Sequence, residues 1–292
     1  MIEFSATFDI AYYRKNHPEL AVLSEGAVIR HYREFAVVRG LTSCVYDRSE
    51  YMRLYLKEMI TDEKILEIGA FDRPFCPDKN VKYFDVIDTE ALKKRAVEAG
   101  RIGGKFPDKI DYVSPTGDLG IVDEKFDIVI SSHVIEHQPD LIKHLSLVGS
   151  LLNDGGLYIM FVPDKRYCFD YFIPESTISE TIAAYVSQQK FHSFKTVLTS
   201  KCQTVHNDPV LHWFGEHGVI DDSIDKFVKA IDEFESAKQN NEYIDAHAWQ
   251  FTPESMGKII KTLRSYGLIE LSLHRLCHTI FGRQEFCVIL KK

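Results

Sequence analysis

Four apolar runs that read as β-strands alternate with helical stretches between residues 64 and 163. The runs are KILEIG, VKYFDVI, FDIVISS and GLYIMFVP, and helical patterns fit 89–99 and 138–152. Parallel strands need a crossover long enough to hold a helix, so this alternation predicts a parallel sheet with helices on both faces. After a helical pattern over 253–265, LIELSLHRL and EFCVILKK are joined by a short connection and should pair antiparallel.

Two further segments lie outside this alternation. Residues 8–41 carry apolar and aromatic residues at helical spacing and predict two or three short helices. Residues 165–250 are rich in histidine and aromatic residues, hold helical patterns at 176–190 and 221–238, and interrupt the sheet pattern. We therefore expect an N-terminal helical cap over 1–50 and one α/β domain over 51–292, in which the insertion 165–250 forms a lid on the acceptor side of the site.

Composition excludes several classes of protein. The formal net charge of -8 over 292 residues argues against nucleic acid as a main partner, because phosphate binding needs a basic surface. The first residues do not read as a signal peptide, and no apolar run is long enough to cross a bilayer. The six cysteines are scattered without a CxxC pair, so we expect reduced thiols in a cytoplasmic protein.

The first strand-to-helix turn, KILEIGAFDRPF, places Glu67 and Gly69 where a parallel sheet binds its ligand. A dinucleotide fingerprint GxGxxG would need glycine at 71 and 74, but Phe71 and Pro74 stand there, so a pyrophosphate fits poorly. A nucleoside ligand without phosphate, carrying a positive charge for Glu67 to offset, fits better. S-adenosylmethionine has both properties.

The chain resembles the class I S-adenosylmethionine-dependent methyltransferases, whose first motif is an apolar strand followed by an acid and glycine. The resemblance covers 60–165 and, in outline, 250–292, and SHVIEH is similar to the VLEH motif common in the group. It implies a doubly wound, mostly parallel, seven-stranded Rossmann-like sheet with an antiparallel C-terminal strand. The cofactor-binding residues that it implies are Glu67, Gly69, Ala70, Asp85, Asp118, Leu119, Ser132 and His133.

Within this set, Asp85 ends the second strand, where a carboxylate accepts hydrogen bonds from two ribose hydroxyls. Asp88 is the second candidate for that role, and a solvated turn aspartate is the alternative. Asp118 lies in the loop after the third strand, where the family places an acid on the adenine amino group. That loop also carries the turn residues Pro115 and Gly117.

Methyl transfer to a hydroxyl needs a base, and histidine can supply one near neutral pH. The candidate bases are His133, His137, His206, His212 and His247. The segments TVHNDPVLHWFGEHG and YIDAHAW also hold Asp208, His217 and Asp245, a mixture that suits either a base or a divalent cation. Their spacings match no standard metal motif, so a metal is allowed but not expected. Histidines that only hold the lid together are the alternative.

The segment PDKRYCFDYF follows the fifth strand, so Asp164, Arg166 and Tyr167 should overhang the acceptor. Arg166 suits a phosphate or carboxylate on the acceptor, or else pairs with Asp170 and holds the loop. Trp213 and Tyr167 suit a sugar ring, although aromatic residues often serve only as core.

Residues 8–41 also resemble a helical module with the pattern FDxxYY, NPD and HYxxxG that recurs in bacterial enzymes of surface-polysaccharide synthesis. Phe35 and Ala36 stand where that module usually has glycine. The resemblance implies a hydroxyl on a bacterial glycan, or its precursor, as acceptor, and S-adenosylhomocysteine as co-product. A homo-oligomer is compatible with the sequence. The alternatives are an NAD- or nucleotide-sugar-dependent enzyme on a similar sheet and a non-catalytic scaffold.

Overall fold

The computed structural model describes residues 10–32, 63–75, 80–101, 103–240, 242–279 and 282–292. Among these residues one seven-stranded sheet has the order β3-β2-β1-β4-β5-β7-β6. The first five strands are parallel, whereas β7 pairs antiparallel with both β5 and β6. The expected mixed sheet with an antiparallel C-terminal strand is therefore confirmed. The strands are β1 (Ile65–Ile68), β2 (Val81–Asp85), β3 (Tyr112–Val113), β4 (Phe126–Ser132), β5 (Leu152–Pro163), β6 (Ser272–Cys277) and β7 (Glu285–Lys291).

Helices cover both faces of the sheet. On one face, α6 (Leu141–Leu151) and α11 (Pro253–Ser265) pack their buried leucines and isoleucines against β4, β5 and β7. On the other face, α5 (Thr89–Glu98) contributes Leu92 to a second core with Ile65, Ile130 and Ile289. Strand residues buried on alternate sides feed two cores, which is why the strands read as continuous apolar runs in the sequence.

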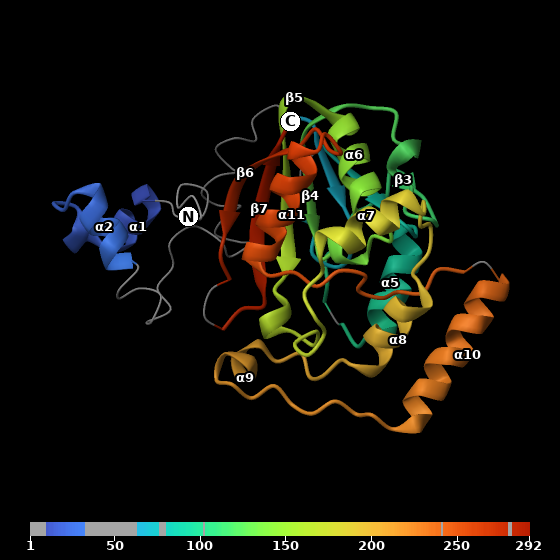
Figure 1. Ribbon diagram of the computed structural model, residues 1–292. Coiled ribbons are helices and arrows are strands. Elements are labelled where there is room, and N and C mark those ends of the chain that lie inside the picture. Colours follow the sequence, from blue (N-terminus) through green and yellow to red (C-terminus); the bar gives the residue numbers. More distant parts are fainter. Residues whose placement is uncertain (1–9, 33–62, 76–79, 102, 241, 280–281) are drawn as a thin grey trace.

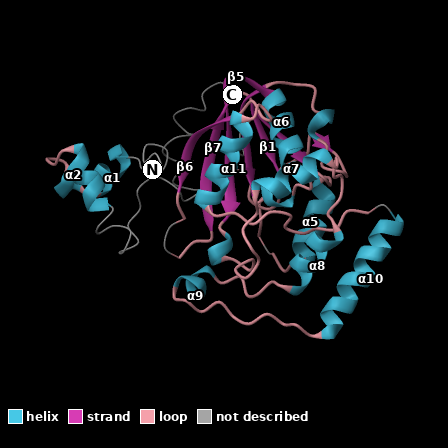
Figure 2. Ribbon diagram, in the orientation of Figure 1, coloured by secondary structure: helices cyan, strands magenta, loops and turns pink. Residues whose placement is uncertain are grey.

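The insertion 165–250 lies at the carboxyl ends of the parallel strands. It contains α7 (Ile178–Val186), α8 (Phe194–Cys202), α9 (Pro209–Trp213) and α10 (Ile224–Asn240). In Figures 1 and 2 the arrowhead of β5 points toward α8 and α9, and α10 lies farther out on the same side. The expected helices at 176–190 and 221–238 are present with shifted ends, whereas α8 and α9 were not predicted because each is short.

Short helices also form near the N-terminus. They are α1 (Ile10–Asn16), the 3-10 turn η2 (Pro18–Leu20) and α2 (Glu25–His31), which share a small cluster of Tyr13, Leu20 and Val28. The helical pattern over 8–41 is thus confirmed as far as residue 32. The rest of that pattern, Phe35 and Ala36, and the expected boundary at residue 50 lie outside the described residues.

Two element boundaries differ from the sequence prediction. The helix expected over 138–152 begins at Leu141, because the Asp140 side chain caps it by accepting from Lys143 N at 2.9 Å. The fifth strand begins at Leu152 rather than after the glycine pair. Gly155 has φ 81° there, so the chain bends without leaving the sheet.

A buried polar chain links β4, α6 and β5. Tyr158 OH lies 2.9 Å from both Ser131 Oγ and His144 Nε2, and the tyrosine is completely buried. Burial lowers the pKa of His144 to about 4, so the imidazole is neutral in the folded protein.

We predict that His144 makes the folded protein less stable as the pH falls. Below pH 6.5 the unfolded chain takes up a proton at this residue while the folded chain does not, so the stabilisation is complete above pH 6.5 and is lost toward pH 4. The loss from this group is about 3 kcal/mol, at 1.36 kcal/mol per pKa unit. Urea unfolding from pH 4 to 7 should give a shallower pH dependence for His144→Gln, whose amide can still bond Tyr158. Parallel curves for the two proteins would contradict this.

Candidate functional site at the carboxyl ends of the strands

The turn after β1 is tight and holds its acid in place. Glu67 is 2% exposed and accepts from Phe75 N through both carboxylate oxygens at 2.9 Å. Gly69 has φ 70°, and a Cβ there would lie 2.7 Å from Val134 Cγ2, so no larger residue fits. Ala70 is buried against the second core. Glu67 therefore braces the loop, and Gly69 lets the turn approach the segment after β4.

Asp85 ends β2 as predicted. One of its carboxylate oxygens accepts from Val86 N at 2.7 Å and Ile87 N at 3.4 Å, and the other has no hydrogen-bond partner among the described residues. Burial raises the pKa of Asp85, against the opposing effect of these two bonds. Asp88 instead caps α5 by accepting from Ala91 N at 2.9 Å. Asp85, with a free acceptor oxygen, suits a ligand hydroxyl better than Asp88.

The loop after β3 is ordered by Asp118. Its carboxylate accepts from Gly120 N at 3.1 Å, and its main-chain N donates to Ser114 Oγ at 3.0 Å. Leu119 is 1% exposed and belongs to the hydrophobic core. The side chain of Asp118 thus has a structural partner, and the side chain of Leu119 packs inward.

Two polar residues end β4. The Ser132 hydroxyl is buried and has no hydrogen-bond partner among the described residues. His133 takes φ 53°, a conformation that non-glycine residues adopt rarely and often at functional sites. Its Nε2 donates to Glu285 Oε2 at 2.7 Å, which turns Nδ1 toward the following turn.

A buried carboxylate lies in that turn, surrounded by imidazoles. Glu136 is completely buried, and neither of its carboxylate oxygens has a hydrogen-bond partner in the described part of the chain. His133 Nδ1, His137 Nε2 and His247 Nε2 lie 3.6, 3.8 and 3.9 Å from Glu136 Oε1. The structure therefore brings together three of the five predicted bases, from two segments more than a hundred residues apart.

Further carboxylates contact the outer sides of these rings. His247 Nδ1 lies 2.6 Å from Asp170 Oδ2, and His137 Nδ1 lies 2.9 Å from Asp245 Oδ1. Burial alone would lower the pKa of His247, but the hydrogen bond to Asp170 together with the negative charges of Asp170 and Glu136 raises the pKa overall. The His137 ring holds the pKa of Asp245 well below its usual range.

The other lid histidines form a separate stack. His206 Nδ1 accepts from Asp208 N, so its Nε2 carries the proton and donates to Glu216 O at 3.0 Å. His212 Nε2 faces His206 O at 3.1 Å, and its Nδ1 lies 3.0 Å from His217 Nδ1. Both nitrogens of His206 and of His212 are therefore engaged. The two rings hold the lid together and have no free lone pair for a substrate proton.

The four residues predicted to lie on the acceptor side form two pairs. Asp164 is completely buried, and its carboxylate accepts two bonds from the Arg166 side chain, at 2.9 and 2.7 Å, and one from Thr279 Oγ1. Asp164 and Arg166 thus pair with each other, and the loop partner of Arg166 is Asp164 rather than Asp170. Tyr167 and Trp213 stack in parallel with ring centres 3.8 Å apart.

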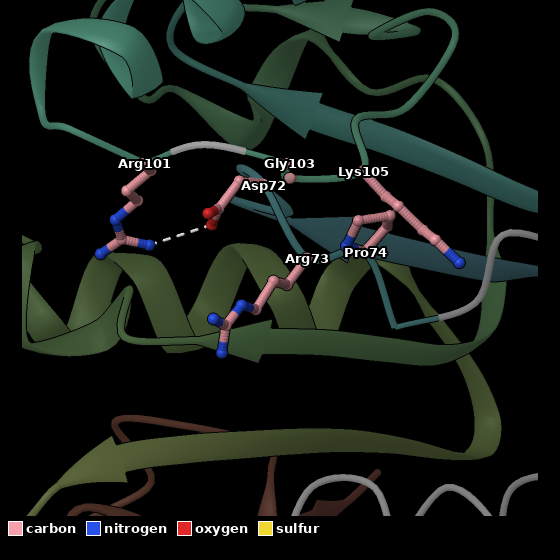
Figure 3. A pocket seen from close by; sticks show the side chains of 7 residues that line it. Asp72, Arg73, Pro74, Arg101, Gly103 and Lys105 are labelled. Carbon is pink, nitrogen blue, oxygen red and sulfur yellow. Dashed lines mark hydrogen bonds and ion pairs between the residues drawn. The ribbon is translucent and has the colours of Figure 1, made fainter.

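The Asp72-Arg73-Pro74 tail of the first turn borders a basic hollow of about 520 Å³ (Figure 3). Asp72 is buried and pairs with Arg101 at 2.9 Å, while the head groups of Arg73 and Lys105 extend to opposite sides. None of the predicted cofactor residues lines this hollow. The tail therefore fixes the segment that follows α5.

Sequence reasoning did not single out Glu136 or Glu285, and it named Asp170 only as a possible partner of Arg166. A usable signal was the spacing H-x-x-E-H in residues 133–137, which in some zinc enzymes supplies two ligands and a carboxylate from a helix. Here the segment runs from the end of β4 into a 3-10 turn, η6 (Ile135–His137). Asp170 and Glu285 lie in distant segments, and nothing local marks them.

A comparison with known proteins identifies the family of this chain. The methyltransferase-domain family matches residues 26–218, well over half of the chain. The chain belongs to this methyltransferase family. No curated protein sequence matches the methyltransferase significantly.

Several solved structures are similar to the methyltransferase at low identity. An S-adenosylmethionine-dependent methyltransferase from Clostridium acetobutylicum matches with a TM-score of 0.42 and 11% identity over 91% of this chain and 98% of that one. Magnesium protoporphyrin IX methyltransferase from Synechocystis, solved with S-adenosylhomocysteine, gives 0.39 and 10% over 92% and 100%. The CcbJ methyltransferase from Streptomyces caelestis gives 0.41 and 9% over 82% and 93%. At this distance the likeness carries nothing about the acceptor.

S-adenosylmethionine is the methyl donor of this class I methyltransferase, and the described residues fit it. Asp85 offers an unpaired carboxylate oxygen at the end of β2, and Ser132 offers an unpartnered hydroxyl at the end of β4. Gly69 keeps the turn between them free of a side chain. Among the described residues no helix is both long and apolar enough to span a membrane.

We predict that Asp85→Ala weakens S-adenosylmethionine binding by about 1–3 kcal/mol, roughly 5- to 150-fold in Kd, because the ribose hydroxyls lose their acceptor. Isothermal titration calorimetry measures this directly. Asp88→Ala is the matched control, since it removes a helix cap and should leave the affinity within about twofold. A normal Kd for Asp85→Ala, or a larger loss for Asp88→Ala, would assign the ribose contact to another acid.

Proposed function

We propose that the protein transfers the methyl group of S-adenosylmethionine to a hydroxyl of a bacterial glycan or its activated precursor. The observation that carries the proposal is the cluster of His133, Glu136 and His137 directly after β4, next to Ser132, against which the insertion places His247. In this family the reactive methyl lies near that strand end. A hydroxyl acceptor is a weak nucleophile that must lose a proton, and imidazoles are suited to accept it.

We assign the base to His133. Its Nε2–H donates to Glu285, so the lone pair on Nδ1 faces the site, an arrangement that fixes the tautomer. The side chain is about 30% exposed, so an acceptor can reach it. The proton passes from the hydroxyl to His133 Nδ1, the oxygen takes the methyl group, and the sulfonium becomes the neutral sulfide of S-adenosylhomocysteine.

Two observations favour a sugar as acceptor. Tyr167, which follows the end of β5, stacks on Trp213 of the insertion, and aromatic residues of this kind suit the apolar face of a sugar ring. The N-terminal segment also resembles a module of surface-polysaccharide enzymes, and its described part folds as short helices. We place the reaction in the cytoplasm, because the six cysteines are scattered along the sequence without a CxxC pair, which is typical of reduced thiols.

We predict that His133→Gln lowers kcat about 10²- to 10⁴-fold, the usual contribution of a general base, with an unchanged Kd for S-adenosylmethionine. The assay follows label from the methyl group of the donor into hydroxyl-bearing oligosaccharides and their nucleotide-linked precursors. His206→Gln is the matched control, since that ring belongs to the lid stack, and it should keep kcat within about threefold.

Three results would contradict the proposal. Full activity of His133→Gln would remove the assigned base. Label found on nitrogen or carbon of the product would replace the hydroxyl acceptor. If the protein binds the donor tightly and methylates a non-sugar hydroxyl but none of the oligosaccharides tested, O-methylation is confirmed and the glycan acceptor is wrong.

A further inference from the structure

Glu136 lacks the partners that a buried carboxylate normally has. It is completely buried, and in the described part of the protein neither oxygen accepts a hydrogen bond. An ionised carboxylate in that state is costly unless a charge or a metal compensates it. The main chain at Glu136 is held in place, because its carbonyl oxygen accepts from Ala248 N at 2.7 Å and Trp249 N at 3.2 Å.

The atoms around this carboxylate are spaced like metal ligands. One ligand atom each from Glu136, His137 and His247 can be chosen so that all lie within 4.8 Å of one another. The two imidazole nitrogens approach Glu136 Oε1 to 3.8 and 3.9 Å. Ligands of a tetrahedral ion bound at 2.0–2.1 Å stand about 3.4 Å apart, so a bound ion would shorten each carboxylate–imidazole distance by about half an ångström and draw the two imidazole nitrogens together.

Outer carboxylates orient both rings for such a role. His247 Nδ1 bonds Asp170 Oδ2 at 2.6 Å, so its Nε2 is left as the inward acceptor. His137 Nδ1 lies 2.9 Å from Asp245 Oδ1 in an ion-pair contact that lacks hydrogen-bond geometry, and its Nε2 lies on the side of Glu136. Metal-binding histidines almost always have a carboxylate, carbonyl or water on their other nitrogen, and this contact sets the tautomer.

We propose that Glu136, His137 and His247 form a binding site for a divalent transition-metal ion of the Zn²⁺ or Mn²⁺ type. Two imidazoles and one carboxylate are a ligand set found in catalytic zinc sites, which keep at least one position open. His137 is only partly buried, with about 25% of its side chain exposed, so an exogenous oxygen can enter. His133 Nδ1, 3.6 Å from Glu136 Oε1, lies next to the open side.

An ion bound in this site would hold the acceptor hydroxyl in a fixed position. This role of the ion rests on the proposed methyl transfer to a hydroxyl. An alcohol oxygen bound to the ion loses its proton more readily, as metal-bound water does. The proton goes to His133 Nδ1, and the oxygen lone pair forms the bond to the methyl carbon. The carbon–sulfur bond breaks and its electron pair stays on sulfur.

The binding test uses the full chain stripped with a chelator and then titrated with Zn²⁺ by calorimetry and with Co²⁺ by visible absorption. We expect about one equivalent of each ion, and d–d bands typical of a four- or five-coordinate Co²⁺ site. Glu136→Gln and His247→Gln should weaken binding at least about 100-fold. Asp170→Asn, a positioning variant, should weaken it about 10- to 100-fold.

His217→Gln is the matched control, because it removes a histidine from the separate lid stack and should leave the affinity and the spectrum unchanged. Circular dichroism and the Kd for S-adenosylmethionine check that each variant folds. If Glu136→Gln does not fold, His137→Gln, on the more exposed side, replaces it. The proposal is overturned if the wild type binds none of Zn²⁺, Co²⁺ or Mn²⁺ stoichiometrically, or if the ligand variants bind them as tightly as the control.

The test separates this site from the proposed function. If the metal binds stoichiometrically, the ligand variants abolish this binding and no hydroxyl is methylated, the metal site is confirmed and the proposed reaction is wrong. If the protein stripped of metal by a chelator transfers methyl groups at an undiminished rate, the proposed reaction stands and the metal site is wrong. In the latter case the carboxylate and imidazoles act only as a proton-sharing network.

Discussion

Two main-chain hydrogen bonds from Ala248 and Trp249 to the carbonyl of Glu136 hold the site together. They join the end of the lid to the turn after β4, and the Trp249 indole adds a bond to Gln138 O at 2.6 Å. Because these bonds fix the main chain of Ala248 and Trp249 against that of Glu136, the neighbouring His247 lies next to Glu136 and His137. Without this contact the insertion would cover the sheet edge but would not place its histidine on the buried carboxylate.

Burial determines the electrostatics of the edge. Glu136, Asp170 and Asp164 are almost inaccessible to water, so the charge of each needs a nearby counterpart. Arg166 and Thr279 supply it for Asp164, and His247 supplies it for Asp170. Of these three carboxylates, Glu136 alone has imidazoles near it without a hydrogen bond to any of them. We propose that Asp85 and Ser132 mark the cofactor side of the site, and that on the acceptor side the charge of Glu136 is compensated by what is bound.

The sequence predicts the sheet well, because local patterns carry the information. Apolar runs over β1, β2, β4 and β5 and the short link between β6 and β7 are sufficient for strand direction, and the position of Asp85 follows from the end of its strand. The pairing of side chains could not be read in this way. His206 and His247 look alike in the sequence, yet His206 has both nitrogens engaged within the lid while His247 faces Glu136. That difference depends on how a long insertion folds back, and no short-range pattern encodes it.

A crystal structure of the protein with S-adenosylhomocysteine would show whether Asp85 and the end of β4 bind the cofactor. We expect density for the ribose hydroxyls against Asp85, with the sulfur directed toward Ser132 and His133, and with open space between the sulfur and Glu136 for an acceptor. Density in the basic hollow beside Arg73 and Arg101, or a ribose away from Asp85, would contradict this expectation.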